Sequence, residues 1–69
     1  MTKKLIRANV SDMKTGQVFA FSRQSLDAEE VWQKKGTRTI SRIKKSTGEV
    51  IATYYFTKED FGYYVEESN

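Results

Sequence analysis

The sequence predicts an α+β fold, ββαβββ, in which one short helix packs on one face of an antiparallel sheet. The dipeptide Thr-Gly occurs at 15–16 and again at 47–48, and each copy separates a polar run from β-branched and aromatic residues, which is typical of hairpin turns. Capping signals around an apolar face between residues 26 and 36 predict the helix. A chain of 69 residues is expected to form one domain, 1–69.

The first hairpin is predicted at the N-terminal end. Residues 4–10 alternate between apolar and polar side chains, which is typical of a half-buried strand. Residues 12–16 have the composition of a turn, and residues 17–23 are predicted as the second strand. A four-residue loop would then place Val10 opposite Phe19.

The helix is predicted over residues 28–35. Asp27 is a suitable N-cap, and Glu30 lies three residues later, which is the arrangement of a capping box. Gly36 is a suitable helix end. Trp32 lies on the apolar face of this helix, so we expect it to anchor the core, with ligand stacking as the alternative role.

The second hairpin is predicted from residues 37–45 and 49–56. A two-residue loop at Thr47-Gly48 would place Arg42 opposite Thr53. Because side chains alternate along a strand, this register assigns every residue of the hairpin to one face or the other.

The C-terminal segment from Thr57 onward is compatible with a helix or a strand. Thr57 and Asp60 resemble the start of a capped helix, but Gly62 would then lie inside the helix at a cost of about 1 kcal/mol. Residues 62–65 have strand composition. We therefore predict a fifth strand that follows a turn at Thr57–Asp60.

One short helix can cover only one face of the predicted sheet, so the other face is expected to be open. The register given above makes that face basic and partly apolar, and such a patch can mark a partner site. The predicted contact residues on it are Arg38, Ile40, Arg42, Lys44, Thr53 and Tyr55.

Composition argues against catalysis. The chain has no Cys and no His, which excludes disulfides, Cys or Ser-His-Asp nucleophiles and thiolate or imidazole metal sites. The four glycines are isolated, so no phosphate-binding loop is present. We expect a protein that is not an enzyme and that has no cofactor. No apolar run is long enough to span a membrane and no signal peptide is evident, which predicts a cytoplasmic protein without a membrane partner.

Three binding hypotheses remain. The net charge is +3, from 12 Lys and Arg against 9 Asp and Glu, which is only mildly basic. The first hypothesis is docking on a partner protein by apolar contact or strand addition. The second is direct binding of single-stranded DNA or RNA through a basic and aromatic sheet face. The third is a homodimer that covers the open face.

One resemblance favours the first hypothesis. The segments 25–32, 36–43 and 47–54 are similar in layout to small phage-encoded inhibitor proteins, among them some anti-CRISPR proteins and phage inhibitors of host enzymes. In such proteins a hairpin, one helix and further strands form a compact unit. The resemblance implies a modulator or inhibitor that docks on a host protein of nucleic-acid metabolism. It implies no functional residue, because it has no diagnostic motif.

Overall fold

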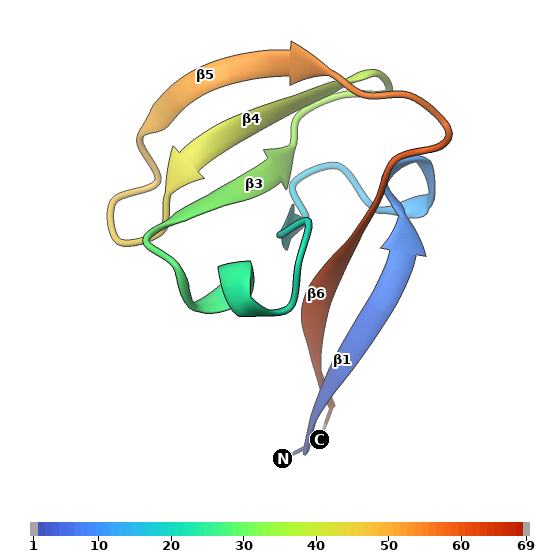
Figure 1. Cartoon of the computed structure of the whole chain (residues 1–69), viewed down its shortest axis with the longest axis vertical. Helices are drawn as coiled ribbons and strands as arrows, with labels where there is room; N and C mark the ends of the chain where they lie inside the picture. The colour runs from blue at the N-terminus through green and yellow to red at the C-terminus, as the bar shows by residue number, and fades with distance from the viewer. Residues whose placement is uncertain (1, 69) are drawn as a thin grey trace.

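The computed structural model describes residues 2–68, and it is nearly all β-structure (Figure 1). Its elements in chain order are β1 (Thr2–Asn9), the 3₁₀ helix η1 (Val10–Asp12), β2 (Val18–Phe19), the 3₁₀ helix η2 (Gln24–Asp27), β3 (Glu30–Lys34), β4 (Thr39–Lys44), β5 (Val50–Tyr55) and β6 (Phe61–Ser68). β1 and β6 form a two-stranded sheet, and β2, β3, β4 and β5 form a four-stranded one in that order. The predicted α+β class is therefore wrong, since residues 2–68 contain no α-helix.

The segment predicted as a helix forms strand β3. Asp27 ends η2, and Ala28 then has an extended backbone (φ −74°, ψ 157°) that leads into the strand. Val31 lies opposite Ile43 of β4, and both are buried. A short isolated helix is unstable in water, whereas pairing with β4 bonds the backbone of β3 and buries β-branched side chains on a pleated surface. Tertiary pairing therefore overrides the local capping signals.

The first predicted hairpin does not form either. β1 pairs antiparallel with β6 along its whole length, from Thr2 opposite Ser68 to Asn9 opposite Phe61. The predicted strand in residues 4–10 is confirmed up to Asn9, after which Val10 begins η1. The strand predicted after the Thr57–Asp60 turn is confirmed as β6. That turn is closed by the Thr57 backbone N–H, which donates to Asp60 Oδ2 at 2.9 Å. The predicted second strand is reduced to β2, which pairs with β3.

The second predicted hairpin is present, but its register is wrong. The loop has four residues, because the Lys44 N–H donates to the Glu49 carbonyl at 2.9 Å and Gly48 takes the left-handed position at φ +77°. A β-bulge between Arg42 and Ile43 shifts the pairing again, so that Ala52 lies opposite Arg42. The other Thr-Gly copy also has a left-handed glycine, Gly16 at φ +96°. The two copies therefore share turn chemistry, although only one of them joins paired strands.

The two sheets meet where β6 crosses the end of β2. Ala20 and Tyr63 exchange two backbone hydrogen bonds, of 2.9 and 2.7 Å. The adjacent Gly62 leaves room for the buried ring of Phe19, since a Cβ at Gly62 would lie 2.7 Å from Phe19 Cδ2 and 2.8 Å from the Ala20 carbonyl oxygen. Glycine at this position is therefore required by close approach of the two strands.

The core lies on one side of this junction and is small. Its buried cluster consists of Val10, Met13, Phe19, Ile40 and Phe56. Lys34 closes one end of the cluster, although it is a charged residue. Its ammonium group donates to the carbonyls of Ser11 (3.1 Å) and Met13 (2.6 Å) and lies 5.5 Å from the centre of the Phe56 ring. Lys34 therefore ties the η1 loop to β3 while keeping its charge hydrogen-bonded.

We expect Gly62→Ala to lower the free energy of unfolding by about 1–3 kcal/mol, the usual cost of forcing atoms into a packed site. The matched control is Gly36→Ala, whose new Cβ would meet only the end of the Thr39 side chain, at 3.1 Å. Urea denaturation of both variants measures the effect. Equal stability of the Gly62 variant and the parent protein would contradict this account of the junction.

Candidate binding surfaces

The predicted contact residues do not form one surface. Arg42 and Lys44 are exposed on β4 as expected, and Arg38 is exposed just before that strand. Ile40, however, is only 3% exposed and belongs to the core cluster. The prediction that Ile40 contributes to an exposed patch is therefore wrong.

Thr53 and Tyr55 lie on the other face of the sheet from Arg42. Thr53 is opposite Ser41, and their hydroxyl oxygens are 3.0 Å apart, which places the two side chains on one face. Tyr55 is opposite Thr39 on the same face. The one-residue change of register moved β5 relative to β4, so the expected set is divided between two faces.

The side of the sheet that carries Arg42 has instead a row of three aromatic side chains, Phe21, Trp32 and Tyr54, which we call the aromatic row. The Phe21 and Trp32 rings are 5.1 Å apart edge to face, and the Trp32 and Tyr54 rings are 5.5 Å apart. Phe21 is 39% exposed and Tyr54 is 48% exposed. Phe21 also meets the buried ring of Phe19 at 5.4 Å, so the row continues into the core.

The sequence interpretation did not predict the aromatic row as a surface. It placed Trp32 on a helix that packs over the sheet side of Phe21 and Tyr54, so all three rings were expected to be covered. In the structure Trp32 belongs to β3, no helix covers that side, and Phe21 and Tyr54 are exposed. Only the pairing of β3 between β2 and β4 brings Trp32 to that side.

Charges of both signs border the aromatic row. Arg42 Nη2 lies 2.6 Å from Glu30 Oε1, and Lys44 Nζ lies 3.7 Å from Glu49 Oε2. All four side chains are roughly half exposed, so the pairs add little to stability. They give the row a polar margin in which each cation has a nearby carboxylate.

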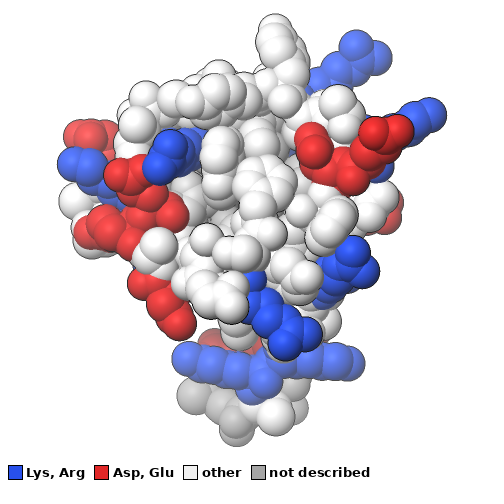
Figure 2. Space-filling view, in the orientation of Figure 1, with Lys and Arg blue, Asp and Glu red and all other residues white. Residues whose placement is uncertain are grey.

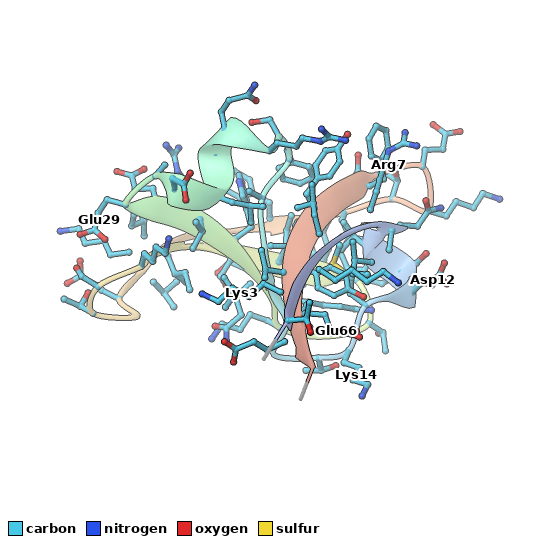
Figure 3. All side chains as sticks on the ribbon, turned by 90° about the horizontal axis from the view of Figure 1, so that it is seen from below. Lys3, Arg7, Asp12, Lys14, Glu29 and Glu66 are labelled. Atoms are coloured by element: carbon cyan, nitrogen blue, oxygen red, sulfur yellow. The ribbon has the colours of Figure 1, made fainter. Side chains whose placement is uncertain are left out.

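A second group, the arginine–aromatic cluster, consists of Arg7, Arg23, Phe61 and Tyr63. The Arg7 guanidinium lies 4.1 Å from the centre of the Phe61 ring, and that of Arg23 lies 5.9 Å from the Tyr63 ring. Arg7 projects from β1 on the side of the ribbon that carries η2 (Figure 3). By strand alternation Phe61 and Tyr63 point away from the face of Gly62, which Phe19 covers. The cluster therefore lies on the opposite side of β6 from Phe19 and from the aromatic row that Phe19 adjoins.

The face that carries η2 is not uniformly basic. Figure 2 shows a broad uncharged area over its centre, with acidic and basic side chains gathered at the margins.

A cleft of about 460 Å³ lies between the terminal end of the β1–β6 ribbon and β3, with apolar walls from Val18, Leu26, Val31 and Val65. Its charged residues are Lys3, Asp27 and Lys45, and the Lys45 ammonium already donates to the Leu26 carbonyl at 2.8 Å. The cleft offers apolar contact without a pair of carboxylates for acid–base chemistry.

Glu29 has a distinct electrostatic environment beside the β4–β5 loop. The Ser46 hydroxyl donates to Glu29 Oε2 at 2.7 Å, and the Ser46 backbone N–H donates to Oε1 at 2.9 Å. These two hydrogen bonds, followed by the nearby charges of Lys44 and Lys45, lower the pKa of Glu29. The carboxylate thereby fastens the loop to the segment that leads into β3.

The described part of the chain contains no group of three acidic, Cys or His side chains placed to hold a metal ion. Within residues 2–68 no helix has the length and hydropathy that a membrane crossing requires. No known protein family, curated protein or solved structure matches this sequence and fold. The surfaces themselves therefore carry the functional argument.

We expect Ser46→Ala to raise the pKa of Glu29, because the hydroxyl hydrogen bond is the largest cause of its lowered value. A carboxyl whose pKa is lowered by folding stabilises the protein above its unfolded pKa, and this stabilisation is lost as the pH falls through the folded pKa. The Ser46 variant should therefore lose less stability on acidification. NMR titration of the Glu29 carboxyl measures the shift, with Thr47→Ala as the neighbouring control. An unchanged Glu29 pKa in the Ser46 variant would contradict the assignment.

Proposed function

We propose that this protein is a non-catalytic binding module that docks on a partner protein through the aromatic row. The observation that carries the proposal is a run in which Trp32 contacts Phe21 on one side and Tyr54 on the other, with Phe21 and Tyr54 exposed and Arg42 at its border. Aromatic and arginine side chains dominate the binding energy of protein interfaces.

The aromatic row is held in place before any partner binds. Phe21 meets both Phe19 and Trp32 edge to face, Tyr54 is tilted against Trp32, and Phe19 fixes the inner end in the core. Rings that are already ordered lose little conformational entropy on association, so more of their contact energy contributes to affinity. The margin of paired charges also suits a protein surface, because Glu30 and Glu49 neutralise Arg42 and Lys44 and so weaken the attraction of these cations for a polyanion.

The proposed partner is a protein of nucleic-acid metabolism. The layout resemblance to phage inhibitors implies a host protein of nucleic-acid metabolism, and that class remains part of the proposal. The helix that contributed to the resemblance is strand β3 here, so the support for docking comes from the aromatic row.

A second candidate function is binding of single-stranded nucleic acid through the arginine–aromatic cluster. The observation that favours it is the pairing of Arg7 with Phe61 and of Arg23 with Tyr63 on one face. Such pairs combine a cation for phosphate with a planar surface for a base. The acidic side chains at the margin of this face weaken the attraction, so protein docking is the leading proposal (Figure 2).

The matched variants Phe21→Ser and Phe61→Ser test the two functions, because both rings are 39% exposed and lie on opposite faces. Capture of proteins by the immobilised chain from an extract of the cells that produce it, treated with nuclease, should identify a partner. Phe21→Ser should weaken that binding about tenfold or more, a loss of about 1.4 kcal/mol, while Phe61→Ser retains it.

The same pair of variants in fluorescence anisotropy with random single-stranded oligonucleotides tests the second candidate. Phosphate contact predicts binding that falls steeply with salt and is lost in Phe61→Ser but kept in Phe21→Ser. Circular dichroism must show both variants folded. Capture that survives nuclease and is equally strong with Phe21→Ser would overturn docking through the aromatic row.

A further inference from the structure

Strand β5 is an exposed edge that carries no charge. It is the last strand of the four-stranded sheet, and it forms the outer rim of the molecule in Figure 1. Its sequence, Val-Ile-Ala-Thr-Tyr-Tyr, contains no Lys, Glu, Asp, Arg or Pro. Tyr55 is 83% exposed, and the Val50 and Ile51 side chains are almost half exposed. Protein edges usually carry charges or proline to prevent pairing with another strand, and β5 lacks both.

The backbone of β5 is free to accept another strand along Thr53–Tyr55. The Phe56 N–H, one residue after the strand, donates to the Arg38 carbonyl at 3.0 Å and so points toward the β4 side. Backbone direction alternates along an antiparallel strand, so the N–H and C=O groups of Thr53 and Tyr55 point outward. The bulge opposite Arg42 and Ile43 bends the strand near its start and leaves the stretch Ala52–Tyr55 regular.

We propose that β5 of a second copy of this chain pairs antiparallel with this edge, with the two-fold axis at Thr53. The four strands of each copy would then form one continuous sheet. The inference goes beyond the proposed docking function and does not depend on it, since it uses the edge of the sheet and not its face.

A second copy is favoured because β5 is complementary to itself in this register. In an antiparallel pair, a residue whose backbone N–H and C=O point outward must lie opposite another residue of that kind. This condition is met when Thr53 of one copy lies opposite Thr53 of the other. Ala52 then lies opposite Tyr54, a small side chain beside a large one. Thr–Thr pairs are among the favourable cross-strand combinations. No like charges are brought together within the paired segment, since β5 has none.

The pairing would double the aromatic row. A two-fold axis perpendicular to a sheet leaves the same face of both copies on the same side. Tyr54, at the outer end of the row, would lie beside Ala52 of the other copy. Two rows would therefore meet at the dimer centre and offer a partner two equivalent contacts, which raises the effective affinity for a partner that can engage both.

Variants with one introduced cysteine test the register of the β5–β5 pairing, because the unaltered chain contains no cysteine. Thr53→Cys should form a disulfide-linked dimer under mild oxidation, since self-opposed residues in a hydrogen-bonded pair have Cα atoms about 5.5 Å apart, within disulfide range. The matched control Ala52→Cys faces Tyr54 in this register and should cross-link at least tenfold more slowly. Analytical ultracentrifugation of the unaltered chain should show a dimer that depends on concentration, and Thr53→Lys, which places two ammonium groups face to face, should abolish it.

Three results would overturn the proposal. The first is an unaltered chain that stays monomeric at all accessible concentrations. The second is cross-linking of Ala52→Cys as fast as that of Thr53→Cys. The third is a chain that is monomeric and whose Thr53→Lys variant no longer captures the partner protein. That result would mean that a strand of the partner, and not of a second copy, pairs with β5. Phe21→Ser combined with Thr53→Cys should still cross-link, so a failure of the docking proposal is distinguishable from a failure of dimerisation.

Discussion

The close approach of β6 to the end of β2 is the constraint on which the rest of this structure depends. At this point Gly62 makes room for the Phe19 ring, and Ala20 and Tyr63 join the two sheets by a pair of backbone hydrogen bonds. Because Phe19 is buried here, the chain leaves β2 with the Phe21 ring against it and directed toward Trp32. The position of the aromatic row is therefore set by a backbone crossing, and any change that displaces β6 would also displace the candidate site.

Small size explains why so much apolar surface remains outside. A chain of this length buries only about 60% of its unfolded surface and has no disulfide to compensate. The core cluster holds five buried side chains, and a hydrogen-bonded lysine, Lys34, completes one end of it. A helix packed on the sheet, as predicted, would have covered part of the remaining apolar area. With β3 in its place, the aromatic row and the β5 edge are exposed, and both have the chemistry of contact surfaces.

The sequence allowed prediction of those features that depend on neighbouring residues. The strand in residues 4–10, the hairpin around Thr47-Gly48 and the turn at Asp60 were identified because alternation and turn composition are local signals. The pairing of β1 with β6 joins the two ends of the chain, and no local pattern specifies it. The register error has a similar origin, since a four-residue loop and a bulge are compatible with the same composition as a two-residue loop. The exposure of Arg42 on β4 was therefore predicted, whereas its cross-strand neighbours, Trp32 and Ala52, were not.

Faces and edges of a sheet provide different kinds of recognition. This protein exposes a face, the aromatic row, and an edge, strand β5, and binding at one does not block the other. Docking through the aromatic row would use side chains perpendicular to the sheet, whereas pairing of β5 would use backbone groups within its plane. Tyr54 is the residue at which the two meet. Its backbone belongs to the edge strand, and its ring ends the row at 5.5 Å from Trp32. Addition of a second strand beside Tyr54 would restrict that ring and remove solvent from one side of it. Dimerisation would then order the outermost residue of the docking surface, so partner binding to the dimer should be favoured even for a partner that contacts a single row.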